Sequence, residues 1–104
     1  MLLLGVTYKA NIADQRESPS VDVANGLLRL GAHVQFHDPY VSRWKTLTTA
    51  LDVVPDLHAA VADADAVVLL QRHAAYDVDD LAARAVVLLD TRGASSADSA
   101  AVRL

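Results

Sequence analysis

The fold of this chain is decided by the stretch Leu2-Leu3-Leu4-Gly5-Val6-Thr7-Tyr8-Lys9-Ala10-Asn11-Ile12-Ala13-Asp14-Gln15-Arg16-Glu17-Ser18-Pro19. Its first part, residues 2–7, is almost continuously apolar, which is typical of a strand buried on both faces of a parallel sheet. The polar part ends at Ser18-Pro19, a pair suited to the N-cap and the first position of a helix. A buried strand, a charged loop and a helix N-terminus in this order favour an anion site, because free N–H groups and cations meet there.

The amino-acid composition limits the classes of protein to which this chain can belong. The chain has 104 residues, 53% of them hydrophobic, so we expect a single domain with a well-filled core. The net charge of −4 argues against nucleic-acid binding. The absence of cysteine excludes disulfides, cysteine-ligated zinc and thiol nucleophiles within these residues. No apolar stretch is long enough to span a membrane and the start does not resemble a signal peptide, so we expect a cytoplasmic protein without a membrane partner.

Hydrophobic periodicity predicts strands and helices in alternation. After the first strand we expect a helix over 19–30 ending at Gly31, a strand over 33–37 ending at Asp38-Pro39, a helix capped by Asp56, a strand over 66–70, a helix capped by Asp77 and a strand over 85–89. Ser95 and Asp98 have the spacing of a capping box, which predicts a final helix. Because the chain starts on a strand and stops in this helix, we expect a fragment of a longer protein.

Residues 40–52 are compatible with more than one structure. Ser42 could cap a short helix that contains Trp44, but the threonines of this segment disfavour a helix and leave a loop as the alternative. The next residues, Val53-Val54, predict a short strand.

Alternating strands and helices predict the fold class α/β, a three-layer, doubly wound and mostly parallel sheet of Rossmann-like form. In such folds ligands bind beyond the carboxyl ends of the strands. Polar residues gather in the loops at these ends: Lys9 to Arg16, Asp38, Gln71 to His73, and Asp90 to Arg92.

A dinucleotide site is not expected in this domain. The Gly-x-Gly-x-x-Gly turn that lets the backbone approach a pyrophosphate is absent, since Gly5 has no partner glycines. Asp38 ends the second strand, as the ribose-binding acid of such sites does, but without the glycines it does not predict NAD binding.

Three cations are candidates for binding an anion. Lys9 offers a compact charge and has no acidic neighbour in sequence, whereas Arg16 and Arg92 offer planar forks. Alternatives remain open for both arginines: Arg16 could pair with a flanking acid and organise its loop, and Arg92 could form a salt bridge with Asp90.

The histidines do not predict a metal site. His33 and His37 would share one face of a strand at a separation of about 13 Å, too far for one ion. His58 is expected on a helix surface, and His73, in a ligand-side loop, is the one histidine considered for a functional role.

Five blocks of the sequence carry a family resemblance: Gly5-Val6-Thr7-Tyr8-Lys9, Asp14-Gln15-Arg16-Glu17-Ser18-Pro19, Gly31-Ala32, Asp38-Pro39-Tyr40 and Asp90-Thr91-Arg92. In this order they resemble the C-terminal, UDP-binding domain of the UDP-glucose/GDP-mannose dehydrogenase family. The resemblance covers nearly the whole chain, so residues 1–104 are interpreted as a single nucleotide-sugar-binding domain of a longer enzyme.

The resemblance implies a two-step, NAD-dependent oxidation of the C6 alcohol of a nucleotide sugar to a carboxylate, as in polysaccharide biosynthesis. It places NAD, the catalytic cysteine and the dimerising segment outside this chain, which then holds no catalytic residue, metal or cofactor. It assigns Lys9 and Arg92 to the substrate and Tyr8 to the pocket wall. Arg16 is a further substrate-binding candidate, and Asp14, Ser18 and Asp38 are supporting residues.

The Arg-Glu-Ser-Pro and His-Asp-Pro-Tyr blocks are more similar to enzymes acting on UDP-sugars, UDP-glucose or UDP-N-acetylhexosamines, than to those acting on GDP-mannose. The full enzyme is expected to be a homo-oligomer. Two alternatives stay open: a stand-alone module that binds a nucleotide or small anion, and a structural or dimerising domain.

Overall fold

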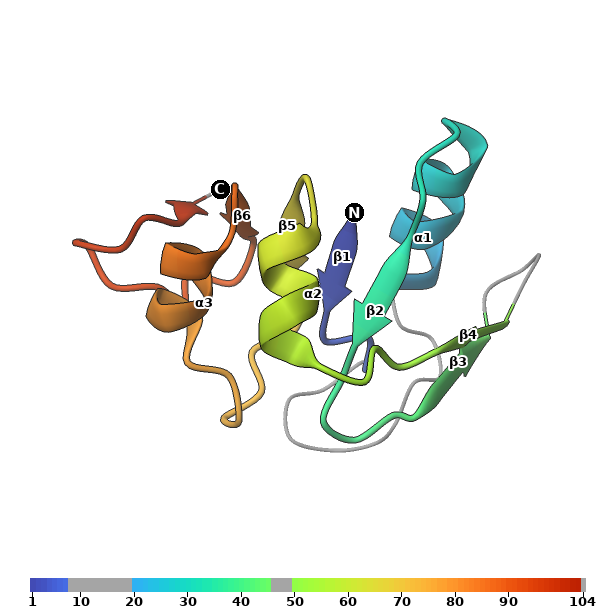
Figure 1. Cartoon of the computed structure of the whole chain (residues 1–104), viewed down its shortest axis with the longest axis horizontal. Helices are drawn as coiled ribbons and strands as arrows, with labels where there is room; N and C mark the ends of the chain where they lie inside the picture. Colours follow the sequence, from blue (N-terminus) through green and yellow to red (C-terminus); the bar gives the residue numbers. More distant parts are fainter. Residues whose placement is uncertain (8–19, 46–49, 104) are drawn as a thin grey trace.

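The computed structural model describes residues 1–7, 20–45 and 50–103, and these residues form a parallel sheet between layers of helices (Figure 1). The sheet has the strand order β2 (Gln35–His37), β1 (Leu2–Leu4), β5 (Val67–Leu69), β6 (Leu88–Asp90) and β7 (Val102–Arg103). All four neighbouring pairs are parallel, with Leu3 opposite Phe36 on one side and Val68 on the other. The predicted α/β class and parallel sheet are confirmed.

Helices cover both faces of this sheet. They are α1 (Ser20–Arg29), α2 (Leu57–Asp63) and α3 (Val78–Arg84). Strand β1 shows why its sequence is all leucine: Leu2 and Leu4 pack in a core cluster with residues of α2 and α3, while Leu3 packs with Ala24 of α1 and Phe36 in a second cluster. Successive strand side chains point to opposite faces, so a strand covered on both faces has no polar position.

The helix ends agree with the predicted signals. Asp56 accepts a hydrogen bond from the N–H of Ala59 at 3.2 Å, and Asp77 accepts one from Asp80 at 3.2 Å. Such an N-cap contributes about 1 kcal/mol to helix stability. Gly31 has a φ of 85° two residues after α1 ends, as a glycine C-terminal stop requires. No helix in the described residues has the length and apolar character needed to cross a membrane.

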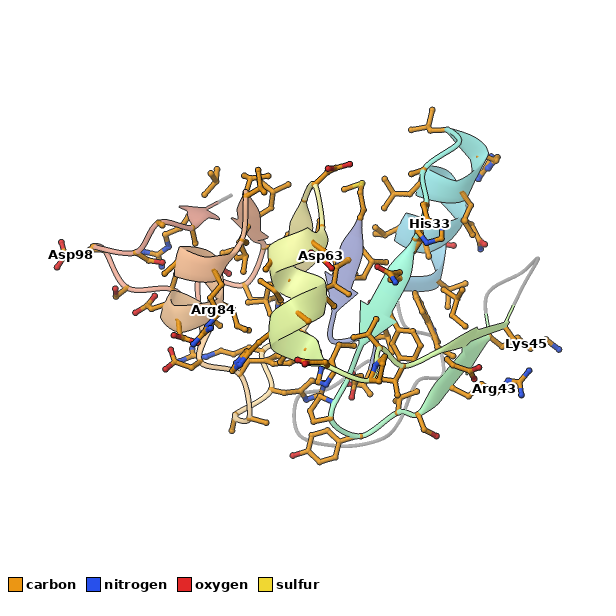
Figure 2. All side chains as sticks on the ribbon, viewed as in Figure 1. His33, Arg43, Lys45, Asp63, Arg84 and Asp98 are labelled. Carbon is orange, nitrogen blue, oxygen red and sulfur yellow. The ribbon has the colours of Figure 1, made fainter. Side chains whose placement is uncertain are left out.

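Within residues 40–52, positions 43–45 and 50–52 form neither the helix nor the loop that the sequence left open. Strand β3 (Arg43–Lys45) pairs antiparallel with β4 (Ala50–Asp52) in a hairpin outside the main sheet. Burial alternates along β3, since Trp44 is 1% exposed while Arg43 and Lys45 project outward (Figure 2). The ring of Trp44 packs edge-on against that of Phe36, with the ring centroids 5.5 Å apart. This period of two belongs to a strand and not to a helix. The strand predicted at Val53-Val54 is wrong, because the pairing ends at Asp52.

The C-terminal part corrects two predictions. The strand predicted over 85–89 is shifted to Leu88–Asp90, and Val86 is 76% exposed. The helix predicted from Ser95 is wrong: Ser95 is buried and bonded to Asp90, and the chain reaches the edge strand β7 instead. The buried hydrogen bond from Ser95 to the Asp90 carboxylate is stronger than the exposed N-cap hydrogen bond that Ser95 would make in a single, isolated turn of helix.

Candidate functional site

The strand order identifies the edge of the sheet where a ligand site is expected. From β1 the chain goes first to β2 on one side and later to β5 on the other, so the strand order reverses between β1 and β5. In open α/β sheets ligands bind outside the carboxyl ends of the strands at such a reversal. The arrows of β1 and β2 point downward in Figure 1, so this edge lies at the bottom of that view.

Asp38, directly after β2, is bound on both carboxylate oxygens. Oδ2 accepts the N–H of Val6 at 2.8 Å and lies 2.9 Å from Nε2 of His73, and Oδ1 accepts the N–H of Tyr40 at 2.8 Å. Its side chain is 0% exposed. Asp38 therefore supports the loop ends from inside the protein and does not face a ribose.

His73, in the loop after β5, is also enclosed. Its Nε2 lies 3.1 Å from Oγ1 of Thr7 as well as 2.9 Å from Asp38, and the rings of Tyr40 and Tyr76 are centred 5.0 and 5.9 Å away. Because a carboxylate only accepts, Nε2 carries the proton that is donated to Asp38. The functional role considered for His73 as a ligand-facing residue does not fit its burial.

The ends of β1 and β5 approach each other closely at Gly5. This glycine has a φ of 80°, and a Cβ on it would lie 2.7 Å from both the Cβ and the carbonyl oxygen of Gln71. The Gln71 side chain donates to the Thr7 carbonyl at 3.3 Å and accepts the N–H of Arg72 at 3.0 Å. Gly5 is therefore required for the close contact between these strand ends, since Gln71 fills the space that a side chain at position 5 would need.

A second polar contact joins β2 to the loop after β5. The hydroxyl of Tyr76 donates to the His37 carbonyl at 2.8 Å and lies 2.9 Å from Nδ1 of His37. Burial raises the pKa of Tyr76, and the nearby charge of Asp38 raises it further. Burial also lowers the pKa of His37, aided by His73 and opposed by Asp38. Both groups are therefore neutral at pH 7.

Arg92 lies after β6 in a loop that is organised by Asp90. The buried Asp90 carboxylate accepts the N–H of Arg92 at 2.9 Å, and from Ser95 both the N–H at 2.8 Å and the hydroxyl at 2.7 Å. Burial by itself would raise the pKa of Asp90, but hydrogen bonds from Ser95, Arg92 and Ala94 outweigh it and hold the pKa well below its usual value.

The alternative salt bridge between Arg92 and Asp90 is wrong, because Asp90 binds the backbone of Arg92 and the guanidinium forms no ion pair within the described ranges. The Arg92 side chain is exposed at the carboxyl edge. It is therefore available to an anion.

Two hollows lie along this edge. One, of about 480 Å³, lies between the loops after β5 and β6 and is lined by Arg72, Tyr76, Asp79 and Ala94 among others. The other, of about 410 Å³, lies beside residues 37–42 and 53–55. Arg72 is exposed and comes after β5, the strand between β1 and β6. The sequence placed it in the polar loop Gln71 to His73 but did not name it among the candidate anion-binding cations, because the strand order that puts this loop between the ends of β1 and β6 was not known.

The structure describes part of the predicted site. Tyr8, Lys9, Asp14, Arg16 and Ser18 lie outside the described residues and stay predictions. Asp38 and Arg92 are described, and both are at the carboxyl edge, on strands separated by β1 and β5.

The histidines are not arranged as the sequence suggested. His33 precedes β2 (Figure 2), so the prediction that His33 and His37 share one face of a strand is wrong. His58 is exposed on α2, as predicted, 3.9 Å from Asp80. Within the ranges described, no three acidic or histidine side chains are grouped to hold a metal ion.

Comparison with known proteins identifies the family of this chain. The model of the UDP-glucose/GDP-mannose dehydrogenase family, UDP binding domain, matches residues 2–97. An NDP-N-acetyl-D-galactosaminuronic acid dehydrogenase of Ralstonia nicotianae is 40% identical over an alignment of 100 residues, which covers 89% of this chain and 22% of that protein. A UDP-glucose 6-dehydrogenase of Rhizobium meliloti is 38% identical over 69 residues, 65% of this chain and 16% of that protein.

Similar solved structures lead to the same family. An NDP-N-acetyl-D-galactosaminuronic acid dehydrogenase of Methanosarcina mazei superposes with a TM-score of 0.77 at 25% identity, covering 99% of this chain and 23% of that one. The UDP-N-acetyl-mannosamine dehydrogenase Cap5O of Staphylococcus aureus gives 0.72 at 29% identity, covering 98% and 25%. The chain thus spans about a sixth to a quarter of the length of these relatives. It belongs to the UDP-glucose/GDP-mannose dehydrogenase family, as the UDP-binding domain of that family.

Proposed function

We propose that this chain holds the UDP part of a nucleotide sugar for an NAD-dependent 6-dehydrogenase that oxidises the sugar's C6 alcohol to a carboxylate. The observation that carries the proposal is the family match over residues 2–97, which includes every loop at the carboxyl edge. The exposed Arg92 is the part of this edge suited to a diphosphate, and the hydrogen bonds of its loop to Asp90 hold the Arg92 backbone in place.

The substrate contacts are proposed from charge and position. Lys9 and Arg92 neutralise the diphosphate, Tyr8 shapes the pocket and Arg16 adds a second fork, with Asp14 and Ser18 supporting the same loop. Phosphate oxygens accept from lysine as a point charge and from arginine bidentately, so the two residue types complement each other.

NAD is proposed to bind outside this chain. A dinucleotide needs a glycine-rich turn and an acid facing the ribose, but Gln71 fills the space over Gly5 and the Asp38 side chain is 0% exposed. The described residues at the ends of β1, β2 and β5 therefore do not fit the cofactor. The remainder of the enzyme would supply NAD binding, the catalytic nucleophile and the contacts of a homo-oligomer.

The substrate is proposed to be UDP-glucose or a UDP-N-acetylhexosamine, used in the cytoplasm for polysaccharide biosynthesis. The names of the relatives support both classes: two are a UDP-glucose 6-dehydrogenase and a UDP-N-acetyl-D-mannosamine dehydrogenase.

Titration of the ¹⁵N-labelled chain, monitored by amide chemical shifts, tests the proposal. UDP, UDP-glucose, GDP-mannose and NAD are each added to about 10 mM, which nearly saturates a site with a Kd of about 1 mM. We expect UDP and UDP-glucose to shift the amides of residues 90–95 and to bind more tightly than GDP-mannose and NAD. Tighter binding of NAD than of both uridine nucleotides would overturn the proposal, and no shift with any uridine nucleotide would favour a structural or dimerising domain.

A further inference from the structure

We propose that the buried Asp38–His73 pair is a positioning element for UDP binding, which acts by fixing the end of β1 at the carboxyl edge. The inference rests on the proposed function and adds residues that do not touch the ligand.

The pair joins three strand ends. Asp38 comes after β2, His73 lies in the loop after β5, and their atoms Oδ2 and Nε2 are 2.9 Å apart. Each also holds the segment after β1, Asp38 through the N–H of Val6 at 2.8 Å and His73 through Oγ1 of Thr7 at 3.1 Å. The end of β1 is therefore held from both neighbouring strands, at the reversal of strand order where ligands bind.

Stability alone does not account for this pair. Both side chains are 0% exposed, and taking polar groups out of water costs free energy that the hydrogen bond between them offsets only in part. Apolar residues of similar volume often give equal or higher stability, whereas hydrogen bonds fix distances and directions that an apolar contact leaves free. The pair thus fixes the position of the backbone at the edge of the sheet where the ligand is proposed to bind.

The end of β1 leads directly into the proposed substrate contacts. Thr7 is joined in sequence to Tyr8 and Lys9, the residues proposed to contact the substrate. The Gln71 side chain also binds the Thr7 carbonyl, and the neighbouring Arg72 is exposed on the same edge. Displacement of Thr7 would move the start of the Lys9 segment, and binding groups must be held to within about 0.5 Å to act together.

The test measures UDP affinity and fold stability in the same variants. His73→Leu removes the polar contacts at similar burial, whereas His73→Gln places an amide N–H₂ near the position of Nε2 and can donate to Asp38 and Thr7. Thr7→Val removes the hydroxyl group and keeps a side chain of the same shape. Val61→Ala, on the buried face of α2, is the control that destabilises the fold through the core.

We expect His73→Leu to raise the Kd for UDP about tenfold, as the loss of a charged hydrogen bond would. His73→Gln should stay within about threefold of wild type, and Thr7→Val should lie between the two. Hydrogen exchange at the Val6 amide should accelerate in His73→Leu and not in Val61→Ala. Val61→Ala should lower Tm without changing the Kd.

If His73→Leu is folded and binds UDP like wild type, the pair is not a positioning element. The same conclusion holds if Val61→Ala weakens binding as much as His73→Leu at equal loss of Tm. Should His73→Leu not fold, Thr7→Val decides, since an unchanged Kd there overturns the inference. Failure of the wild-type chain to prefer uridine nucleotides would instead count against the proposed function.

Discussion

Nε2 of His73 and Oδ2 of Asp38 lie 2.9 Å apart, with both side chains fully buried where β1, β2 and β5 end. The two residues are 35 positions apart in the chain. Their contact converts two polar residues of separate loops into one support for the carboxyl edge of the sheet.

Asp38→Ala should destabilise the fold severely, because it leaves the N–H groups of Val6 and Tyr40 without their acceptor and His73 without its charged partner. Removing one member of a buried pair costs about 3–5 kcal/mol in the free energy of unfolding. Urea unfolding monitored by circular dichroism measures this. Asp65→Ala, at an exposed position, is the control and should stay within about 0.5 kcal/mol of wild type. Equal stability of the two variants would refute the prediction.

Arg92→Ala should weaken UDP binding by about tenfold or more, since a charge-assisted contact to the diphosphate is lost while the Asp90 loop remains closed. Titration of the ¹⁵N-labelled variant with UDP measures the Kd. Arg29→Ala gives the same change in net charge at the last turn of α1, away from the carboxyl ends of the strands, and should leave the Kd unchanged. A similar loss in both variants would mean that only the overall charge matters.

Ser95→Ala should lower stability by about 1–3 kcal/mol, because the buried Asp90 carboxylate loses a hydroxyl donor at 2.7 Å. The loss should depend on pH. Hydrogen bonds depress the pKa of Asp90 in the folded protein, so the stability that they add is present above the unfolded value of 3.8 and is lost as the pH falls through the folded pKa. Urea unfolding of wild type and variant between pH 2 and 6 checks this, and a gap that widens toward acid would contradict it.

The wild-type chain should lose stability as the pH falls below 6.5, because burial lowers the pKa of His37 in the folded state. The unfolded state then binds more protons than the folded state, so the free energy of unfolding decreases on the acid side and is constant above 6.5 for this group. His37→Asn keeps an N–H donor near Tyr76 but cannot titrate. The pH dependence of wild type minus that of His37→Asn isolates the effect, and an unchanged slope would exclude it.

Gly5→Ala should destabilise the domain, because the backbone has a φ of 80° and a new Cβ would lie 2.7 Å from Gln71. We expect a loss of about 1–3 kcal/mol from the backbone conformation, with overlap adding to it. Gly26→Ala is a matched control within α1, where a Cβ meets nothing within 4 Å. It should raise stability by about 0.5–1 kcal/mol, since alanine favours a helix. Thermal unfolding of both variants measures the difference, and a stabilising Gly5→Ala would show that the strands separate easily.

The sequence by itself determined the fold class and most of its elements. The apolar runs at residues 2–7 and 66–70 predicted strands, which the structure has at Leu2–Leu4 and Val67–Leu69. Asp56 and Asp77 predicted helix starts, and all these signals depend on residues near one another in the chain. The ordered motif blocks also led to the correct family. Arg92 was placed at the carboxyl edge from its position after a strand.

Tertiary structure alone decided which polar residues of that edge face a ligand. Asp38 and His73 resemble exposed loop residues in sequence, but their contact with each other and with residues 6 and 7 buries them. The final helix failed for the same reason, since Ser95 binds Asp90 across the loop instead of capping a turn. Local sequence patterns depend on the spacing of residues along the chain. A buried carboxylate accepts hydrogen bonds from whichever donors lie near it in space, and these distances depend on the strand order, which no short segment of sequence determines.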